Sequence, residues 1–173
     1  AAKKAGRVAA EGIVKTFVSA DKKTAAMVEV NCETDFVAAN EEFVTFATKV
    51  AELAANTSAT TVEELVAEKM DGEATVTEAL TALIAKLGEN MTVRRFVKFN
   101  IENGAIASYI HGGGRIGVMV EVACNVESDV LEEVAREVCM QVAAANPLFL
   151  SKEQVDNEAL EKEKEIYRVQ ALN

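Results

Sequence analysis

The chain has 173 residues, a length that suits one domain or two small ones and lets folding bury about 70% of the unfolded surface. Half of the residues are apolar, but no apolar run reaches the roughly 18 residues of a transmembrane helix, so the sequence predicts no membrane partner. The net charge of −10 repels phosphate backbones, which argues against direct contact with nucleic acid.

Apolar periodicity and turn residues divide the chain into strands and helices. The expected elements are, in order, a helix end over 1–11, strands over 13–19 and 24–32, helices over 40–55, 61–72 and 75–87, strands over 91–102, 105–110 and 115–124, a helix from 128 or 129 to 145, a single turn over 151–155 and a charged helix from 156 onward. Because the chain starts without Met and its last helix has no stop signal, a start and an end in mid-chain are expected.

Capping and turn residues set several of these boundaries. Thr61 and Thr75 each precede a glutamate by three residues, which is the spacing of a capping box at the start of a helix. Gly12 and Gly88 stand where helices are expected to end. The three glycines that follow His111 predict a hairpin turn with positive φ angles.

The sequence contains an internal repeat. A shift of 92 residues places the run Met-Val-Glu-Val-x-Cys that begins at Met27 on the same run at Met119, and places Gly12 on Gly104 without a gap. The alternative is chance agreement between two apolar hairpins, but four identical consecutive residues inside a gapless match argue against it. Both halves therefore predict a strand–turn–strand–helix unit.

The expected fold class follows from the repeat. It is α+β, with two related strand–strand–helix modules, antiparallel sheet and helices packed on the sheet. Three parts are expected along the chain: a first core module over 1–102, a second, repeat-related module over 103–155, and a C-terminal helix over 156–173.

The most distinctive stretch is the polar turn that follows the second strand. Thr34, Asp35 and Phe36 place an acid and an aromatic side by side at a strand-to-helix junction. Turns lie at the surface, so Phe36 is either folded back into the core or offered to a partner, and for an isolated Phe the core is the commoner outcome. Because Phe43 and Phe46 already supply the apolar stripe of the following helix, we expect Phe36 to be at least partly exposed in the free protein.

A catalytic motif and a nucleotide-binding motif are each incomplete or absent in the sequence. His111 and its glycines look like the oxyanion-hole motif of some lipases, but the chain has no G-x-S-x-G nucleophile elbow and no second His. It also has no G-x-x-x-x-G-K-[ST], so binding of GTP through a P-loop is not expected. The sequence therefore predicts an interaction protein, not an enzyme, in which His111 is a plain loop residue, the favoured interpretation, or a contact to a partner.

The cysteines give no sign of a metal or of another cofactor. Cys32, Cys124 and Cys139 lie among apolar residues and lack C-x-x-C spacing. With one His in the chain, a zinc site would need carboxylates, and no motif supplies them. Buried, reduced thiols in a cytosolic protein are the expected state.

Residues 29–40, Glu-Val-Asn-Cys-Glu-Thr-Asp-Phe-Val-Ala-Ala-Asn, resemble the most recognisable signature of the bacterial-type translation elongation factor Ts family. Further resemblances at 2–6, 88–95 and 111–118 span nearly the whole chain in the family's order. The resemblance implies the core and dimerisation-domain region, and the family's small N-terminal helical domain and later C-terminal segment are not expected within these 173 residues.

The resemblance implies a guanine nucleotide exchange factor that binds the GTPase elongation factor Tu and has no cofactor of its own. In that family the Asp-Phe pair, here Asp35 and Phe36, is inserted near the nucleotide and magnesium site of the GTPase. Thr34 and Val37 are then expected to shape the turn, with His111 as a further candidate contact. The implied location is the bacterial cytoplasm, with plastid or mitochondrion as alternatives.

The two copies of the repeat differ at this turn. The residues that follow the strand in the second copy are Asn-Val-Glu-Ser over 125–128, so only the first copy has an acid and an aromatic side by side. One GTPase per chain is therefore expected. The alternative function is a structural dimerisation module without exchange activity, in which paired sheets bury the two Met-Val-Glu-Val strands and Phe36 is a core residue.

Overall fold

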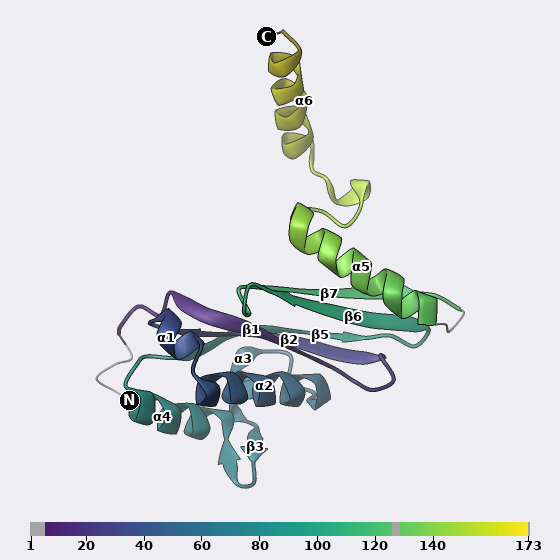
Figure 1. Cartoon of the computed structure of the whole chain (residues 1–173). Helices are drawn as coiled ribbons and strands as arrows, with labels where there is room; N and C mark the ends of the chain where they lie inside the picture. The colour runs from purple at the N-terminus through teal and green to yellow at the C-terminus, as the bar shows by residue number, and fades with distance from the viewer. Residues whose placement is uncertain (1–5, 126–128, 173) are drawn as a thin grey trace.

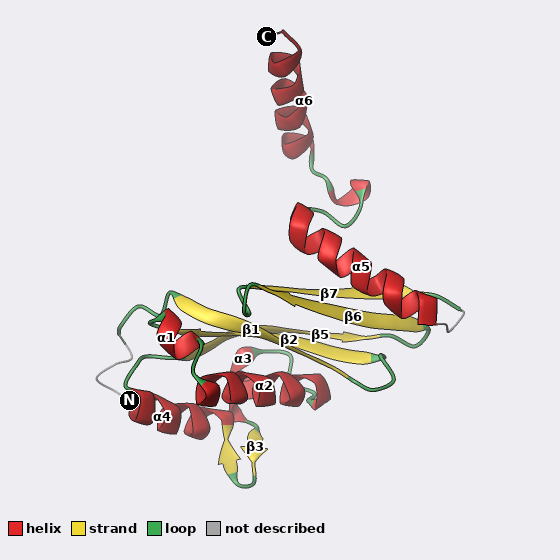
Figure 2. Ribbon diagram, in the orientation of Figure 1, coloured by secondary structure: helices red, strands yellow, loops and turns green. Residues whose placement is uncertain are grey.

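The computed structural model describes residues 6–125 and 129–172. Its helices and strands are, in chain order, β1 (Glu11–Val18), β2 (Thr24–Cys32), α1 (Asp35–Ala38), α2 (Glu41–Asn56), α3 (Val62–Ala67), β3 (Lys69–Asp71), β4 (Ala74–Thr75), α4 (Val76–Leu87), β5 (Thr92–Asn100), β6 (Gly104–His111), β7 (Ile116–Ala123), α5 (Asp129–Ala145), the single 3-10 turn η1 (Lys152–Gln154) and α6 (Asn157–Leu172) (Figures 1 and 2). The mixture of helices and antiparallel sheets confirms the α+β class predicted from the sequence.

The larger sheet has the antiparallel order β1–β2–β5 and packs on α2. The apolar side chains of β2 alternate, so that one face of the strand meets the buried stripe of α2. The buried cluster between sheet and helices includes Ile13, Ala26, Val28, Val30, Cys32, Phe43, Phe46, Ala47, Val50, Leu65, Val76, Leu83, Ile84 and Val93. This core fixes the end of β2, from which the polar turn departs.

The second hairpin, β6–β7, lies on the opposite face of β1 and is covered on its outer side by α5 (Figure 1). Its register repeats that of the first hairpin at the 92-residue shift, because Ala105 pairs with Val122 as Ile13 pairs with Val30. The internal repeat seen in the sequence is therefore a repeat of strand pairing as well.

Contacts between the two hairpins join equivalent positions of the repeat. The hydroxyl of Thr16 donates to the hydroxyl of Ser108, 92 residues later, at 3.2 Å. The amide of Val14 donates to the carbonyl of Gly114 at 2.7 Å, and at the positions related by the same shift the amide of Ile106 donates to the carbonyl of Lys22 at 2.9 Å. A contact between two equivalent residues is what a two-fold relation between duplicated units produces.

Two boundary predictions were wrong. Residues 6–10 form no helix, and Gly12 does not end one but lies inside β1, paired with Asn31. The helix opened by Thr61 ends at Ala67 and not near 71–72, and the β3–β4 hairpin follows it. Glu68 explains the early end, because its backbone is extended, its carboxylate accepts from the Thr57 hydroxyl and its carbonyl accepts from the amide of Val76.

The other capping predictions are confirmed. Thr61 and Thr75 both form capping boxes, and Gly88 ends α4 with a left-handed φ of 83°. The side chain of Asn40 accepts from two amides at the start of α2. The predicted helix over residues 1–5 and the predicted cap at Ser128 lie outside the described residues.

The last helix, α6, extends away from the two sheets (Figure 1), and none of its described residues is buried. Over the ranges 6–125 and 129–172, no helix combines the length and the apolar character that a membrane crossing requires.

Candidate partner-binding site

The polar turn is a single turn of helix, α1, placed directly after β2. Thr34 is its N-cap, and the Thr34 hydroxyl accepts from the amide of Val37 at 3.3 Å. Asp35 is the first helical residue, where a carboxylate favours the helix dipole. The sequence Thr-Asp-Phe-Val therefore makes its own short helix and orients Asp35 and Phe36 as consecutive residues on it.

Phe36 points into solvent, with 85% of its surface exposed. Asp35 beside it is also exposed, whereas Val37 packs against the core as a partly buried residue. The expectation that Phe36 is exposed in the free protein is confirmed, and the alternative that Phe36 is a core residue is wrong. The fold therefore does not use this aromatic side chain in its own core.

A buried thiol lies beneath the turn. Cys32, the last residue of β2, is fully buried and donates from its sulfur to the carbonyl of Thr34 at 3.2 Å. Burial raises the pKa of the Cys32 thiol to about 11, and the nearby negative charge of Glu89 acts in the same direction. The thiol therefore stays protonated at neutral pH and acts as a donor to the turn.

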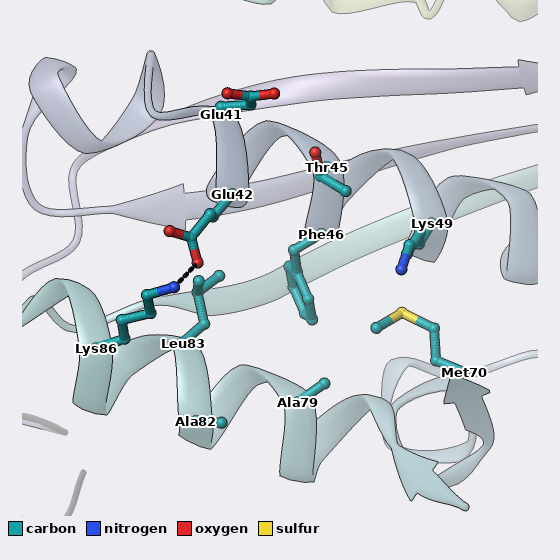
Figure 3. Close-up of a pocket in the computed structure, with 10 residues that line it drawn as sticks. All are labelled: Glu41, Glu42, Thr45, Phe46, Lys49, Met70, Ala79, Ala82, Leu83 and Lys86. Carbon is teal, nitrogen blue, oxygen red and sulfur yellow. Dashed lines mark ion pairs between the residues drawn. The ribbon is translucent and has the colours of Figure 1, made fainter. Parts of the chain in front are cut away.

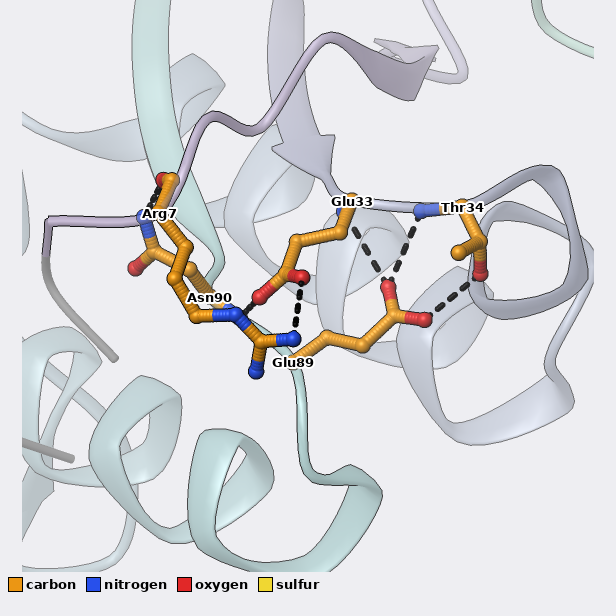
Figure 4. A network of polar contacts seen from close by, with 5 residues as sticks. All are labelled: Arg7, Glu33, Thr34, Glu89 and Asn90. Atoms are coloured by element: carbon orange, nitrogen blue, oxygen red, sulfur yellow. Dashed lines mark hydrogen bonds and ion pairs between the residues drawn. The ribbon is translucent and has the colours of Figure 1, made fainter. Parts of the chain in front are cut away.

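Glu89 contacts the turn from the end of α4 (Figure 4). One of its carboxylate oxygens accepts from the amides of Glu33 and Thr34, at 3.1 and 3.0 Å, and the other accepts from the Thr34 hydroxyl at 2.6 Å. Sequence reasoning did not single out this residue. Its partners lie 55 and 56 residues away in the chain, so no local pattern marks it.

The carboxylate of Glu33, at the end of β2, adds contacts to the segment after α4 and to the segment before β1 (Figure 4). Its carboxylate accepts from the amide of Asn90 at 2.6 Å and forms an ion pair with Arg7 at 3.2 Å. The side chain of Asn90 donates to the carbonyl of Arg7 at 2.7 Å. The end of β2, the segment after α4 and the segment before β1 are thereby joined at the base of the turn.

A groove of about 480 Å³ between α2 and α4 carries a further link (Figure 3). Its floor includes Phe46 and Leu83, and at its rim Lys86 forms an ion pair with Glu42 at 2.6 Å. Lys86 stands in the last turn of α4, three residues before Glu89. The ion pair between Lys86 and Glu42 therefore holds the end of α4 against α2, next to the segment that contains Glu89.

His111, the other candidate contact, lies on a different hairpin. It is the last residue of β6 and is exposed, and its Nδ1 is 2.9 Å from the hydroxyl of Tyr109. Gly112, Gly113 and Gly114 follow it with φ angles of 61°, 68° and 99°, which confirms the predicted glycine turn. The structure thus brings together Thr34 to Val37 on one turn, whereas His111 belongs to another hairpin, which packs against β1.

Within residues 6–125 and 129–172, no group of three or more His, Cys, Asp or Glu side chains is placed to hold a metal ion. The amides of Glu33 and Thr34 and the hydroxyl of Thr34 are bound by Glu89. The chemistry that remains available to a partner is the Phe36 ring and the Asp35 carboxylate.

Comparison with known proteins gives one consistent result. The family model described as Elongation factor TS matches residues 33–173. The chain is 74% identical over 173 residues to Elongation factor Ts of Clostridium botulinum (strain Alaska E43 / Type E3), 71% identical over 173 residues to that of Clostridium perfringens (strain SM101 / Type A), and 61% identical over 175 residues to that of Clostridium novyi (strain NT). In each comparison all of this chain is covered, and it spans 57% of the relative's length.

Proposed function

We propose, since the chain belongs to the elongation factor Ts family, that it is a guanine nucleotide exchange factor which binds the GTPase elongation factor Tu and promotes release of GDP during translation elongation. The observation that carries the proposal is the exposed Phe36, 85% accessible on a turn that the protein holds through Thr34 and Val37. A rigid, protruding aromatic is typical of the anchor residues that dominate protein interfaces.

Release follows from thermodynamic linkage in a complex of factor, GTPase and nucleotide. If the factor and GDP each weaken the binding of the other, the coupling is reciprocal, and we expect the weaker binding of GDP to show as faster release. GTPases hold their nucleotide phosphates with Mg²⁺, a Lys and P-loop amides. Phe36 enters between the elements that carry these groups and shifts them, while Asp35 competes for the nearby hydrogen-bond donors.

The partner and the location belong to the same proposal. One elongation factor Tu binds per chain, because only the first repeat carries the acid and the aromatic. The bacterial cytoplasm is the proposed location, supported by the clostridial relatives. The alternative, a structural module without exchange activity, loses support because Phe36 is not buried in the fold.

The test is release of a fluorescent GDP from the GTPase, measured with Phe36→Ala. Loss of a protruding anchor removes about 2 kcal/mol of interface energy, which corresponds to roughly 30-fold slower release at a given concentration of factor. The melting temperature should stay close to that of the wild type, because an exposed side chain changes the free energy of unfolding by only about 0.5 kcal/mol. A core Phe would instead cost roughly 3–5 kcal/mol.

Tyr167→Ala is the matched control, since Tyr167 is an aromatic with 68% of its surface exposed on α6, away from the turn. It should leave GDP release close to the wild-type rate. If Phe36→Ala promoted GDP release at the wild-type rate, the proposal would be overturned. A large fall in the melting temperature of Phe36→Ala would show that the ring supports the fold.

A further inference from the structure

We propose that Glu89 is a positioning residue for exchange, which sets the orientation of the Asp35–Phe36 turn before the partner is bound. This inference rests on the function proposed above. Glu89 itself touches neither nucleotide nor GTPase in this proposal. It acts through Thr34, whose amide and hydroxyl it binds.

The turn needs an external support. A helix of four residues is far too short to be stable by itself. Phe36 is exposed and makes no packing contribution that would fix its direction. Val37 and Ala38 pack the C-terminal part of the turn against the core, and its N-terminal side is fixed by Glu89, the acceptor for the amides of Glu33 and Thr34.

The Thr34 hydroxyl makes this support specific. It accepts from the Val37 amide as the N-cap and donates to Glu89 at 2.6 Å. Because a carboxylate only accepts hydrogen bonds, the Thr34 hydroxyl must be the donor to Glu89. A lone pair of the hydroxyl oxygen is then free to accept from the Val37 amide. One carboxylate thus fixes both the backbone entering the turn and the hydrogen bond that closes it.

Glu89 is in turn held by a rigid element. It follows Gly88, which ends α4 in the left-handed conformation, and α4 packs through Leu83 and Ile84 into the core. Lys86 adds the ion pair to Glu42 of α2. The position of α4 therefore determines the position of Phe36. Because the turn is already ordered in the free protein, binding of the partner does not have to offset the entropy lost in ordering it.

The experiment measures GDP release against factor concentration, so that the maximal rate and the half-saturating concentration are separated. Glu89→Ala removes three hydrogen bonds to a charged acceptor, and the maximal rate should fall about tenfold. The half-saturating concentration should change by less than about threefold, because other surfaces still bind the partner. Glu89→Gln keeps an oxygen for the two amides and should retain most of the maximal rate.

Glu78→Ala is the control for lost stability. Glu78 accepts from the amide and the hydroxyl of Thr75 at the other end of α4, so the same kind of contact is lost away from the turn. It should lower the melting temperature and keep the wild-type maximal rate. If Glu78→Ala and Glu89→Ala lower the maximal rate equally, Glu89 supports only the fold and the inference is wrong.

A spectroscopic measurement tests the orientation directly. The chain has no Trp, so Phe36→Trp places a single reporter on the turn. Adding Glu89→Ala should speed the decay of its fluorescence anisotropy, and an unchanged decay would overturn the inference. If Phe36→Ala slows GDP release while Glu89→Ala does not, only the role of Glu89 fails; if Phe36→Ala has no effect, the proposed function itself fails.

Discussion

At the scale of single residues, Cys32 links the stability of the protein to pH. Its pKa is about 11 in the folded protein because the thiol is buried, against about 8.5 for a thiol in an unfolded chain. The unfolded state therefore loses this proton first as the pH rises. We expect the contribution of Cys32 to the free energy of unfolding to be complete below about pH 8.5 and to be lost between there and about pH 11.

Urea unfolding of the wild type and of Cys32→Ala at a series of pH values from 7 to 11 measures this effect. The difference in stability between the two proteins should shrink as the pH rises, because the wild type alone loses the contribution. Burial also raises the pKa of Cys139, but that thiol is present in both proteins and cancels. A difference that stays constant over this range would contradict the prediction.

Phe36 and Glu89 show which features of the site can be predicted from neighbouring residues in the sequence. The exposure of Phe36 could be predicted, because a polar turn between a strand and an amphipathic helix is a local pattern. The contact from Glu89 could not, since it depends on α4 packing against α2 and reaching residues 55 and 56 positions away. The network around Arg7 was missed for the same reason.

At the scale of elements, two equivalent glycines let the paired strands approach closely. Gly104 has a φ of 127°, and a Cβ there would collide with the carbonyl oxygen of Val122. Gly12 faces Val30 in the same way in the first hairpin. Gly104→Ala should therefore lower the free energy of unfolding by about 3 kcal/mol or more, through strain and backbone displacement together.

Gly113→Ala is the matched control for that substitution. Gly113 also has a positive φ, 68°, but a Cβ would meet no atom within 4 Å. Its cost should be the conformational strain alone, about 1–2 kcal/mol. The urea midpoints of the two variants decide the prediction, and equal midpoints would show that the close approach of β6 and β7 has no role of its own.

Most elements were predictable because their boundaries are set by neighbouring residues. The capping boxes at Thr61 and Thr75 fixed the starts of α3 and α4, and the left-handed Gly88 fixed an end. The end of α3 was not predictable, because it depends on the bond of Glu68 to Thr57, 11 residues earlier. Gly12 was misread since its positive φ serves a close strand contact and not a helix end.

At the scale of the whole molecule, the two repeats form back-to-back hairpins with a helix on each outer face (Figure 1). The division into a first module over 1–102, a second over 103–155 and a C-terminal part over 156–173 stays a prediction. Strand β5 has its place in the sheet of the first repeat, and β1 contacts both β6 and β7. We infer that the second repeat supports the first and meets the partner at another surface.

The asymmetry between the repeats predicts one GTPase per chain. Asp35→Ala removes the exposed acid next to Phe36 and should slow GDP release at saturating factor. Asp129→Ala, the control in the second repeat, removes an exposed acid from the first turn of α5, where it favours the helix dipole by about 0.3–1 kcal/mol. It should lower the free energy of unfolding by that amount and leave GDP release nearly unchanged. Sedimentation of the complex should give one GTPase for each chain, whereas two GTPases per chain, or equal losses of exchange in the two variants, would mean that both repeats act on nucleotide.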